Sequence, residues 1–274
     1  MNSRLRHLIA PIAVSVFCSA NCFAQTPKRD AKVQAALDQM TAAYKALSVV
    51  HIKMVAHTTV SDPSIIKSAD IPESIEIKLQ RPNKLVLDIW RSKLGSRVHV
   101  LLVSDGVNLW KWNSSSAVVE KSKAPAAIFD IKDLPNDSPE MDILLRGNEP
   151  FKDFSLGGSE ASLSMGGTAK VGDADTDSIE LRLPAAGSPI SGTLQIRLGQ
   201  RDHFVRNISF EGGGKDPRIN KDVKFKFEVT YPILNPAPVF TTDDFRFVPP
   251  AGAKIVVDRP ERRPVAPDTR KESK

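Results

Sequence analysis

Three short segments, IEIKL at residues 75–79, LVLDI at residues 85–89 and VHVLL at residues 98–102, repeat one alternation of apolar and polar side chains. A period of two is typical of a β-strand with one buried face. The joints carry Pro-Asn at residues 82–83 and Asp-Gly at residues 105–106, which suit tight turns. The block therefore predicts a meander of antiparallel strands that is apolar on one side. That side covers either a filled core or a hydrophobic cavity, and the pattern leaves both open.

Further strands are predicted on both sides of this block. One precedes it at residues 49–60, and the meander continues through residues 107–112 to about residue 121. The second half of the chain contains seven more predicted strands, separated by glycine-rich turns: residues 151–156, 161–165, 178–183, 193–198, 204–211, 223–231 and 240–247. Many short strands with few helices predict a mainly β protein built on one strongly curved antiparallel sheet.

Two helices are predicted among these strands. Residues 30–47 are amphipathic, with apolar side chains recurring every three or four positions. Residues 138–146 have Ser138 at the N-cap, Pro139 at the first position and Gly147 after the end. Glu140 stands near the positive end of this second helix dipole, where an acidic residue is favourable. The second helix lies between the two strand-rich halves.

The N-terminus has the features of a secretory signal peptide. Arg4 and Arg6 precede an apolar stretch at residues 8–19, which is too short to span a membrane. Small residues near Ala24 predict cleavage after it, so residues 1–24 form the signal peptide. Neither Cys18 nor Cys22 has the flanking residues of a lipidated cysteine. The sequence therefore predicts a secreted or periplasmic protein.

Cleavage leaves 274 − 24 = 250 residues without cysteine, because both cysteines lie in the signal peptide. This excludes a disulfide, a thiolate nucleophile and a cysteine metal site from the mature chain. Removing two arginines lowers the formal charge from +6 to 6 − 2 = +4, which is ordinary for a soluble protein. Residues 259–274 are rich in proline and charge and are expected to be a disordered tail. The length permits one large domain or two.

No motif predicts catalysis or metal binding. The four remaining histidines, His51, His57, His99 and His203, show neither HxH nor HExxH spacing and are read as surface residues. The sequence also lacks a nucleophile elbow, a P-loop and a dinucleotide-binding fingerprint. We therefore expect no enzyme activity, no metal and no cofactor. A hydrolase would need a nucleophile and a base that the sequence does not assemble.

Two features have alternative interpretations. Trp110 and Trp112 are two residues apart and share one face of a strand, where they either pack against the core or rim or stack on a ligand. Arg81 ends a strand just before Pro82, where it is either a solvated turn residue or a donor to the backbone carbonyls of another element.

Several blocks resemble the periplasmic lipoprotein carriers of the Lol pathway, the LolA/LolB-like superfamily. These are KLQRPN at residues 78–83, LVSDG at 102–106 with Leu109 and Trp110, and FRFVPPAG at 245–252, in the family's order. Pro139, Met141, Arg146 and Asn148 fit the family's central lid helix. The same blocks are similar to the longer periplasmic proteins of the DUF2092 type.

The resemblance implies one domain over residues 25–258: an incomplete β-barrel whose helices cover its concave face. It also implies a periplasmic carrier that holds a lipid or an acylated lipoprotein in a hydrophobic cavity under a helical lid, with Arg81 as the latch of that lid. The candidates for lining the cavity are Ile52, Met54, Ile77, Leu79, Leu85, Leu87, Val98, Val100, Leu102, Trp110, Trp112, Met141, Leu144 and Leu145.

We expect a monomer whose further partners are envelope proteins of the inner or outer membrane, with no nucleic acid. The alternative is a non-enzymatic envelope adaptor or structural module. Its interior would be packed, and it would bind another protein through a sheet edge or the tryptophan pair.

Overall fold

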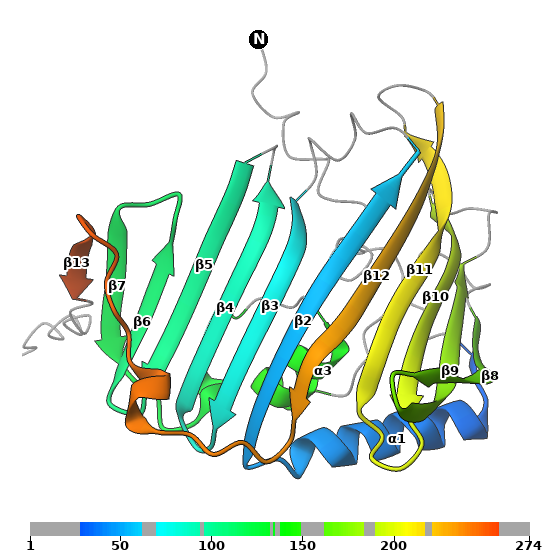
Figure 1. The fold of residues 1–274 in the computed structure, drawn as a ribbon, viewed down its shortest axis with the longest axis horizontal. Helices are drawn as coiled ribbons and strands as arrows, with labels where there is room; N and C mark the ends of the chain where they lie inside the picture. The colour runs from blue at the N-terminus through cyan, green and yellow to red at the C-terminus, as the bar shows by residue number, and fades with distance from the viewer. Residues whose placement is uncertain are drawn as a thin grey trace, which may run out of the picture.

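The computed structural model describes residues 28–61, 70–93, 96–131, 134, 138–148, 162–183, 190–216 and 221–257. The expected signal peptide, the strand expected at residues 151–156 and the tail at residues 259–274 lie outside these ranges. The described strands form a single 13-stranded sheet (Figure 1). The prediction of a mainly β protein built on one large sheet is confirmed. Within the described residues, no helix has both the length and the apolar character that crossing a membrane requires.

The first half of the chain forms the predicted meander. Helix α1 leads into it, and each strand pairs antiparallel with the next. The elements are α1 (Ala31–Lys45), β2 (Val49–Val60), β3 (Asp70–Gln80), β4 (Lys84–Lys93), β5 (Ser96–Asp105), β6 (Asn108–Asn113) and β7 (Val118–Lys123). Asp30 caps α1 by accepting a hydrogen bond from the Val33 amide.

A short helical segment separates the two halves. It contains η2 (Ile128–Asp130), α3 (Pro139–Met141) and η3 (Asp142–Arg146), a π-helical turn that continues α3. The Ser138 hydroxyl accepts a hydrogen bond from the Met141 amide, and Gly147 ends the segment at φ 70°. The predicted helix, its cap and its terminating glycine are therefore confirmed. We call residues 138–147 the central helical segment.

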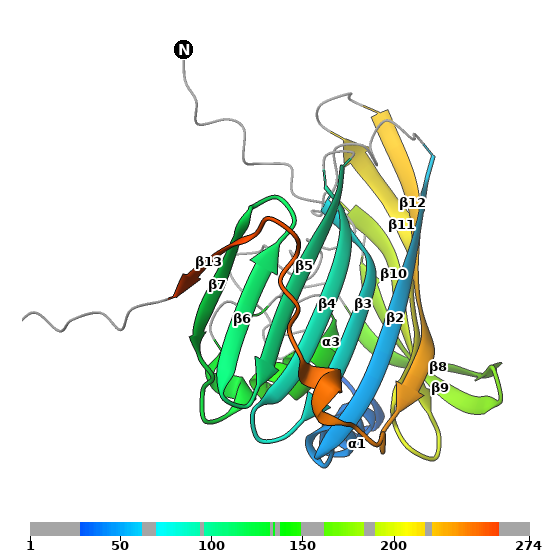
Figure 2. The ribbon, with the colours of Figure 1, turned by 60° about the vertical axis from the view of Figure 1, so that its left-hand side comes forward.

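The second half forms another antiparallel meander. Its strands are β8 (Ser162–Val171), β9 (Ala174–Leu183), β10 (Ile190–Gly199), β11 (Val205–Asp216) and β12 (Lys221–Asn235). Strand β12 then pairs antiparallel with β2, which joins the two meanders into one sheet. Short strands β1 (Lys28–Arg29) and β13 (Lys254–Val257) pair parallel with β8 and β7 and form the two edges. Because the edges do not meet, the curved sheet is an incomplete barrel (Figure 2).

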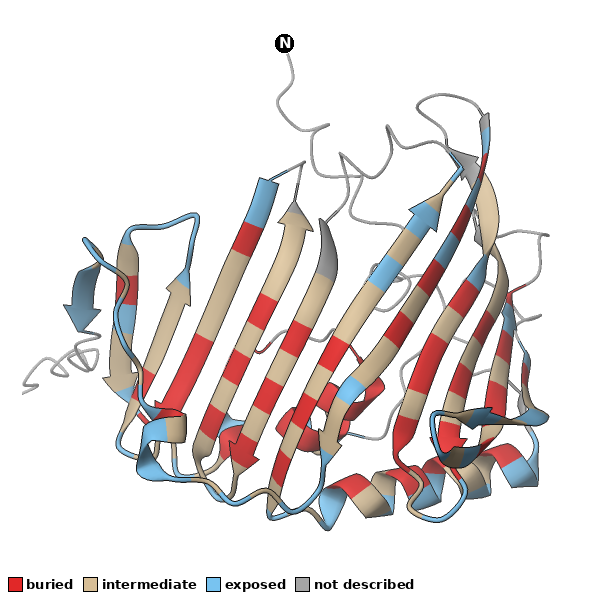
Figure 3. Ribbon diagram, in the orientation of Figure 1, coloured by how far each residue is buried: buried red, intermediate tan, exposed pale blue. Residues whose placement is uncertain are grey.

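The core lies between the sheet and the helices on one of its faces. Burial alternates along β2, β3 and β4, as Figure 3 shows. Helix α1 turns Val33, Leu37, Met40 and Tyr44 into the same apolar cluster. Both α1 and α3 lie on this side of the sheet in Figures 1 and 2. The apolar face predicted from the alternation is therefore the face that the helices cover.

The last described segment crosses the opposite, outer face. The strand predicted at residues 240–247 is wrong, because residues 242–245 form the 3₁₀ turn η4 (Thr242–Phe245). Asp244 and Thr241 form a capping box that favours this turn over an extended strand. Phe245 is buried, and Figure 1 shows the turn in front of the sheet, away from α1 and α3. We call residues 236–257 the C-terminal strap.

Candidate functional site

The candidate site begins with the covered face of β2 to β5. The residues predicted to share this face are buried in one apolar cluster with the central helical segment: Ile52, Met54, Ile77, Leu79, Leu85, Leu87, Leu102, Met141, Leu144 and Leu145. Val100 is half-buried against the cluster, and Val98 is buried near the far end of β5. The alternation thus brings these side chains together on one face. That they line a ligand cavity stays a prediction.

Arg81 connects this face to the helices above it. Its Nε donates to the Leu47 carbonyl just beyond α1, at 3.0 Å, and its Nη2 donates to the Leu144 carbonyl in η3, at 3.3 Å. Burial lowers the pKa of the guanidinium, a group that holds its proton across the physiological range. Arg81 therefore joins a sheet turn to two helical segments through backbone carbonyls. This contact corresponds to the alternative in which it donates to another element, and a solvated turn residue is excluded.

The turn that carries Arg81 is itself fixed. The Asn83 side-chain amide donates to the carbonyls of Gly106 and Pro125, each at 3.1 Å. The Phe129 ring packs on the guanidinium at 4.7 Å from its centroid, a distance at which a cation–π contact is favourable. A rigid base and a flat ring leave the arginine little freedom away from the two carbonyls.

Glu140 lies on the buried side of the central helical segment. Its side chain is fully buried, and its Oε1 accepts a hydrogen bond from the Tyr231 hydroxyl on β12. Tyr231 follows the buried residues Phe227 and Val229 at the same parity of β12, which turns its hydroxyl toward the helices. Burial raises the pKa of the Glu140 carboxyl, and that of the Tyr231 hydroxyl rises well above its ordinary value for the same reason.

The sequence prediction missed the burial of Glu140, which it placed near the helix dipole alone. The signal was present, because Glu140, Ile143 and Leu144 stand at i, i+3 and i+4 on one helical face. Both apolar members of that face are fully buried, and the carboxyl is buried with them.

The prediction that Trp110 and Trp112 line the cavity is wrong. Trp112 is opposite Leu101 and Trp110 is opposite Val103, at the strand parity that points away from buried Leu102. Both tryptophans therefore lie on the outer face. Their apolar size misled the prediction, since on β6 it is Leu109 that points into the core.

On the outer face these tryptophans pack against other aromatic rings. Trp110 stacks on Phe247 of the C-terminal strap, with ring centroids 5.2 Å apart. Trp112 meets the edge of His99, which stacks on Trp90 at 4.0 Å. The packing alternative for the pair is therefore the one that the contacts support.

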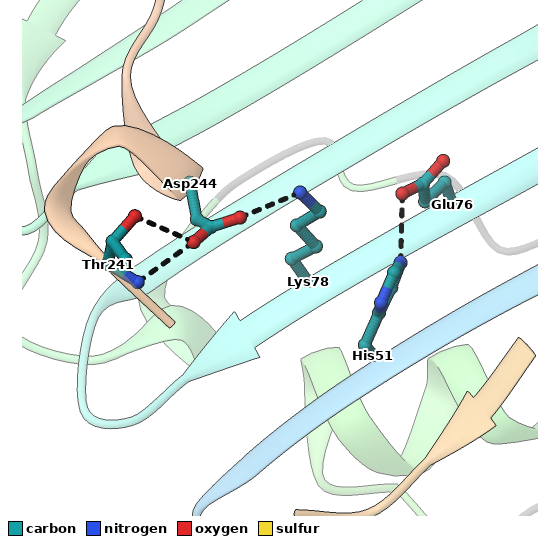
Figure 4. A network of polar contacts seen from close by, with 5 residues as sticks. All are labelled: His51, Glu76, Lys78, Thr241 and Asp244. Carbon is teal, nitrogen blue, oxygen red and sulfur yellow. Dashed lines mark hydrogen bonds and ion pairs between the residues drawn. The ribbon is translucent and has the colours of Figure 1, made fainter. Parts of the chain in front are cut away.

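Polar contacts are also present on this outer face. The distance from His99 Nε2 to Asp88 Oδ1 is 2.9 Å, and the distance from His51 Nε2 to Glu76 Oε1 is also 2.9 Å. Lys78 reaches Asp244 of η4 at 3.0 Å (Figure 4). The placement of His51 and His99 on the outer face is confirmed. Among the described residues, no three or more histidine, cysteine or acidic side chains are grouped so that they could hold a metal ion.

A family model described as predicted periplasmic protein (DUF2092) matches residues 33–257 of the chain. No curated protein matches it. Among solved structures, the chain is similar to the lipoprotein LppX of Mycobacterium tuberculosis. The sequence identity is 17%, the match covers 77% of this chain and 99% of LppX, and the TM-score is 0.40. It is also similar to LprF from Mycobacterium bovis, with 13% identity, coverage of 84% of this chain and 100% of LprF, and a TM-score of 0.39. A LolA superfamily protein from Nitrosomonas europaea matches with 10% identity, coverage of 78% of this chain and 97% of that protein, and a TM-score of 0.27.

Proposed function

The chain belongs to the DUF2092 family of periplasmic proteins, and from that premise we propose that it is a non-enzymatic carrier. It holds a lipid or an acylated lipoprotein between the concave face of its sheet and the central helical segment, which acts as a lid. The single observation that carries the proposal is the pair of bonds from Arg81 to Leu47 and Leu144. We further propose secretion with cleavage after Ala24 and a single working domain over residues 25–258.

The contact between lid and sheet is chemically suited to exchange. The lid buries Met141, Ile143, Leu144 and Leu145 against aliphatic side chains of the sheet. An acyl chain that replaced the lid would bury similar apolar area, at about 0.8 kcal/mol per methylene, without needing specific polar partners. Opening therefore exchanges one apolar surface for another, and the main specific loss is the hydrogen bonding of the lid.

Arg81 supplies one of these hydrogen bonds, to the Leu144 carbonyl, and Tyr231 supplies another, to Glu140. A hydrogen bond from a charged donor is worth about 1.5–3 kcal/mol, which is enough to hold a short helical segment closed yet small enough to be released when ligand binds. The contact of Arg81 with the lid is thus reversible. It is present when the lid covers the apolar face and absent when a ligand does.

A first experiment asks whether the protein carries lipid. Mature protein is purified from the periplasm, weighed by native mass spectrometry and extracted with organic solvent. We expect a co-purifying acylated species whose mass matches the extracted lipid. Absence of lipid, together with no binding of a hydrophobic fluorescent dye, would sink the carrier function.

A second experiment tests the latch. Arg81→Leu should increase hydrogen exchange at the amides of residues 143–146 about tenfold or more, because opening no longer breaks a charged hydrogen bond. Arg97→Leu is the matched control, since Arg97 also packs on a ring and bonds Glu73 of β3, two strands away, yet lies on the outer face. Equal exchange rates in wild type and Arg81→Leu would refute the latch.

A second candidate function is an envelope adaptor with a packed interior. It is favoured by β13, which forms one edge of the sheet within the described residues and exposes Ile255, Val256 and Val257. Such an edge can accept a strand from another protein. A purified protein that is free of lipid but binds an envelope protein through β13 would select this alternative.

A further inference from the structure

The central helical segment carries one buried polar atom that has no partner. Within the part of the chain that the structure describes, four buried side-chain atoms lack a hydrogen bond, and Glu140 Oε2 is the only one of them on the lid. Its companion Oε1 accepts from Tyr231, so half of the carboxyl is satisfied and half is not. A buried polar atom without a partner costs about 1–3 kcal/mol, so its presence calls for an explanation.

The surroundings of this carboxyl favour its protonated form. Glu140 is fully buried, and burial is the largest cause that raises the pKa of its carboxyl; the nearby carboxylate of Asp142 raises it further. Hydrogen bonds from Tyr231, from the backbone of Glu140 itself and from the Ser138 side chain lower this pKa, but they only partly offset the effect of burial. Tyr44 of α1 is also fully buried close by and accepts a hydrogen bond from the Val205 amide at 3.1 Å. A hydroxyl and a carboxyl therefore share a buried surrounding, and the cation that acts there, Arg206, affects Tyr44.

The direction of the bond from Tyr231 indicates which oxygen carries the acid proton. Tyr231 donates its hydroxyl proton to Oε1, so the proton of a neutral Glu140 belongs to Oε2. Oε2 is then a buried O–H donor that needs an acceptor. Glu140 is buried on the same face of the central helical segment as Ile143 and Leu144, which would contact the acyl chain in the proposed carrier.

We propose that Glu140 Oε2 donates a hydrogen bond to a carbonyl oxygen of the bound ligand, so that the site selects acyl chains joined to their carrier group through an ester or an amide. This inference rests on the carrier function proposed above and names the polar end of the same site. A hydrocarbon or an ether of equal length would bury the same area but offer Oε2 no carbonyl. An acyl carbonyl, by contrast, gives a partner to Glu140 Oε2, which has none in the closed form.

Matched ligands test the selection. Methyl palmitate, N-methylpalmitamide and hexadecyl methyl ether compete with a hydrophobic fluorescent dye for the mature full-length protein. We expect the ester and the amide to bind about three- to tenfold more tightly than the ether, which corresponds to one net hydrogen bond. Equal affinities for all three would overturn the inference while leaving the carrier function standing. If none of the three binds, the carrier function fails and the inference with it.

Two variants of Glu140 separate hydrogen bonding from folding. Glu140→Gln places an amide N–H where the acid O–H stands and still accepts from Tyr231, so it should keep the preference for a carbonyl. Glu140→Leu should bind all three ligands with nearly equal affinity. A Glu140→Leu variant that keeps the wild-type preference would overturn the inference. If Glu140→Leu folds poorly, the test relies on Glu140→Gln. Loss of the preference for a carbonyl ligand in Glu140→Gln would also overturn the inference.

A pH series adds an independent arm. The titratable groups that face Glu140 are Tyr231 from β12, Tyr44 from α1 and Asp142 from η3, with Arg206 and Asp202 acting on Tyr44. All of them are retained in Glu140→Gln, so a difference between the two pH profiles isolates Glu140. The preference of the wild type should fall as rising pH ionises the carboxyl, whereas that of the Gln variant stays constant. Parallel profiles would contradict the role of the O–H donor.

Discussion

The two faces of the same strands hold their covers by different means. On the concave face, the central helical segment packs aliphatic side chains against those of the sheet, and Arg81 and Tyr231 each donate one hydrogen bond to it. On the outer face, the C-terminal strap is held by a lysine–aspartate ion pair and by a tryptophan stacked on a phenylalanine. Directional contacts fix a segment in one position, whereas apolar burial accepts any apolar surface. The difference fits the proposed function, in which the concave cover exchanges with a ligand while the outer cover remains in place.

Adjacent residues of β3 give the strongest test of this contrast. Leu79 is fully buried on the concave face, while its neighbour Lys78 points outward to Asp244. Leu79→Ala should lower the free energy of unfolding by about 2–5 kcal/mol, because it leaves a cavity in the core. Lys78→Ala should lower it by less than about 1 kcal/mol. Urea denaturation of both variants measures the two values, and similar losses would mean that the faces are not distinct.

The aromatic contact of the strap gives a smaller effect. In a double-mutant cycle, Trp110→Ala and Phe247→Ala should show a coupling energy of about 0.5–1.5 kcal/mol, as expected for stacked rings. Trp112 provides the control, because it shares the strand and the face but packs against His99. The same cycle with Trp112→Ala should give a smaller coupling. Comparable coupling in both cycles would show that the strap is not held at Trp110 in particular.

Much of the sheet was predictable because strand alternation is local. The alternation in residues 75–102 placed Ile77, Leu79, Leu85 and Leu87 on one face, and the structure buries all four together. Cap chemistry likewise predicted the helix that begins at Ser138, since its signals are neighbours in the sequence. A local sequence pattern therefore predicts which side chains of a strand are buried wherever one face of the strand is buried along its whole length.

What the sequence did not predict depends on contacts between distant segments. Arg81 could be assigned a donor role, but its acceptors Leu47 and Leu144 are set by how the helices cross the sheet. The stacking partner of Trp110, Phe247, lies on the strap, which reaches this face from the other end of the domain. For the strap, alternating phenylalanines suggested a strand, whereas the bonds from Thr241 to Asp244 select a turn.

The smallest expected effect concerns the ion pair of the strap. The Thr241 amide and then the Lys78 ammonium lower the pKa of Asp244 to about 2. Because the pKa is lowered by folding, the contribution of Asp244 to stability is complete above the ordinary carboxyl pKa and is lost as the pH falls through about 2. At neutral pH the contact is therefore intact, and mild acid should leave the strap in place.

An NMR titration of the Asp244 carboxyl carbon measures this pKa directly. Lys78→Met should raise the titration midpoint only part of the way toward the ordinary value, because the larger contribution comes from the Thr241 amide, which this change leaves in place (Figure 4). Lys84→Met is the control, since Lys84 contacts the same turn through the Phe245 ring. A midpoint that moves equally in both variants would mean that general surface charge, and not the Lys78 contact, sets the pKa. Only a shift specific to Lys78→Met ties the strap to β3 through a directional bond, the kind of contact that holds the cover of the outer face.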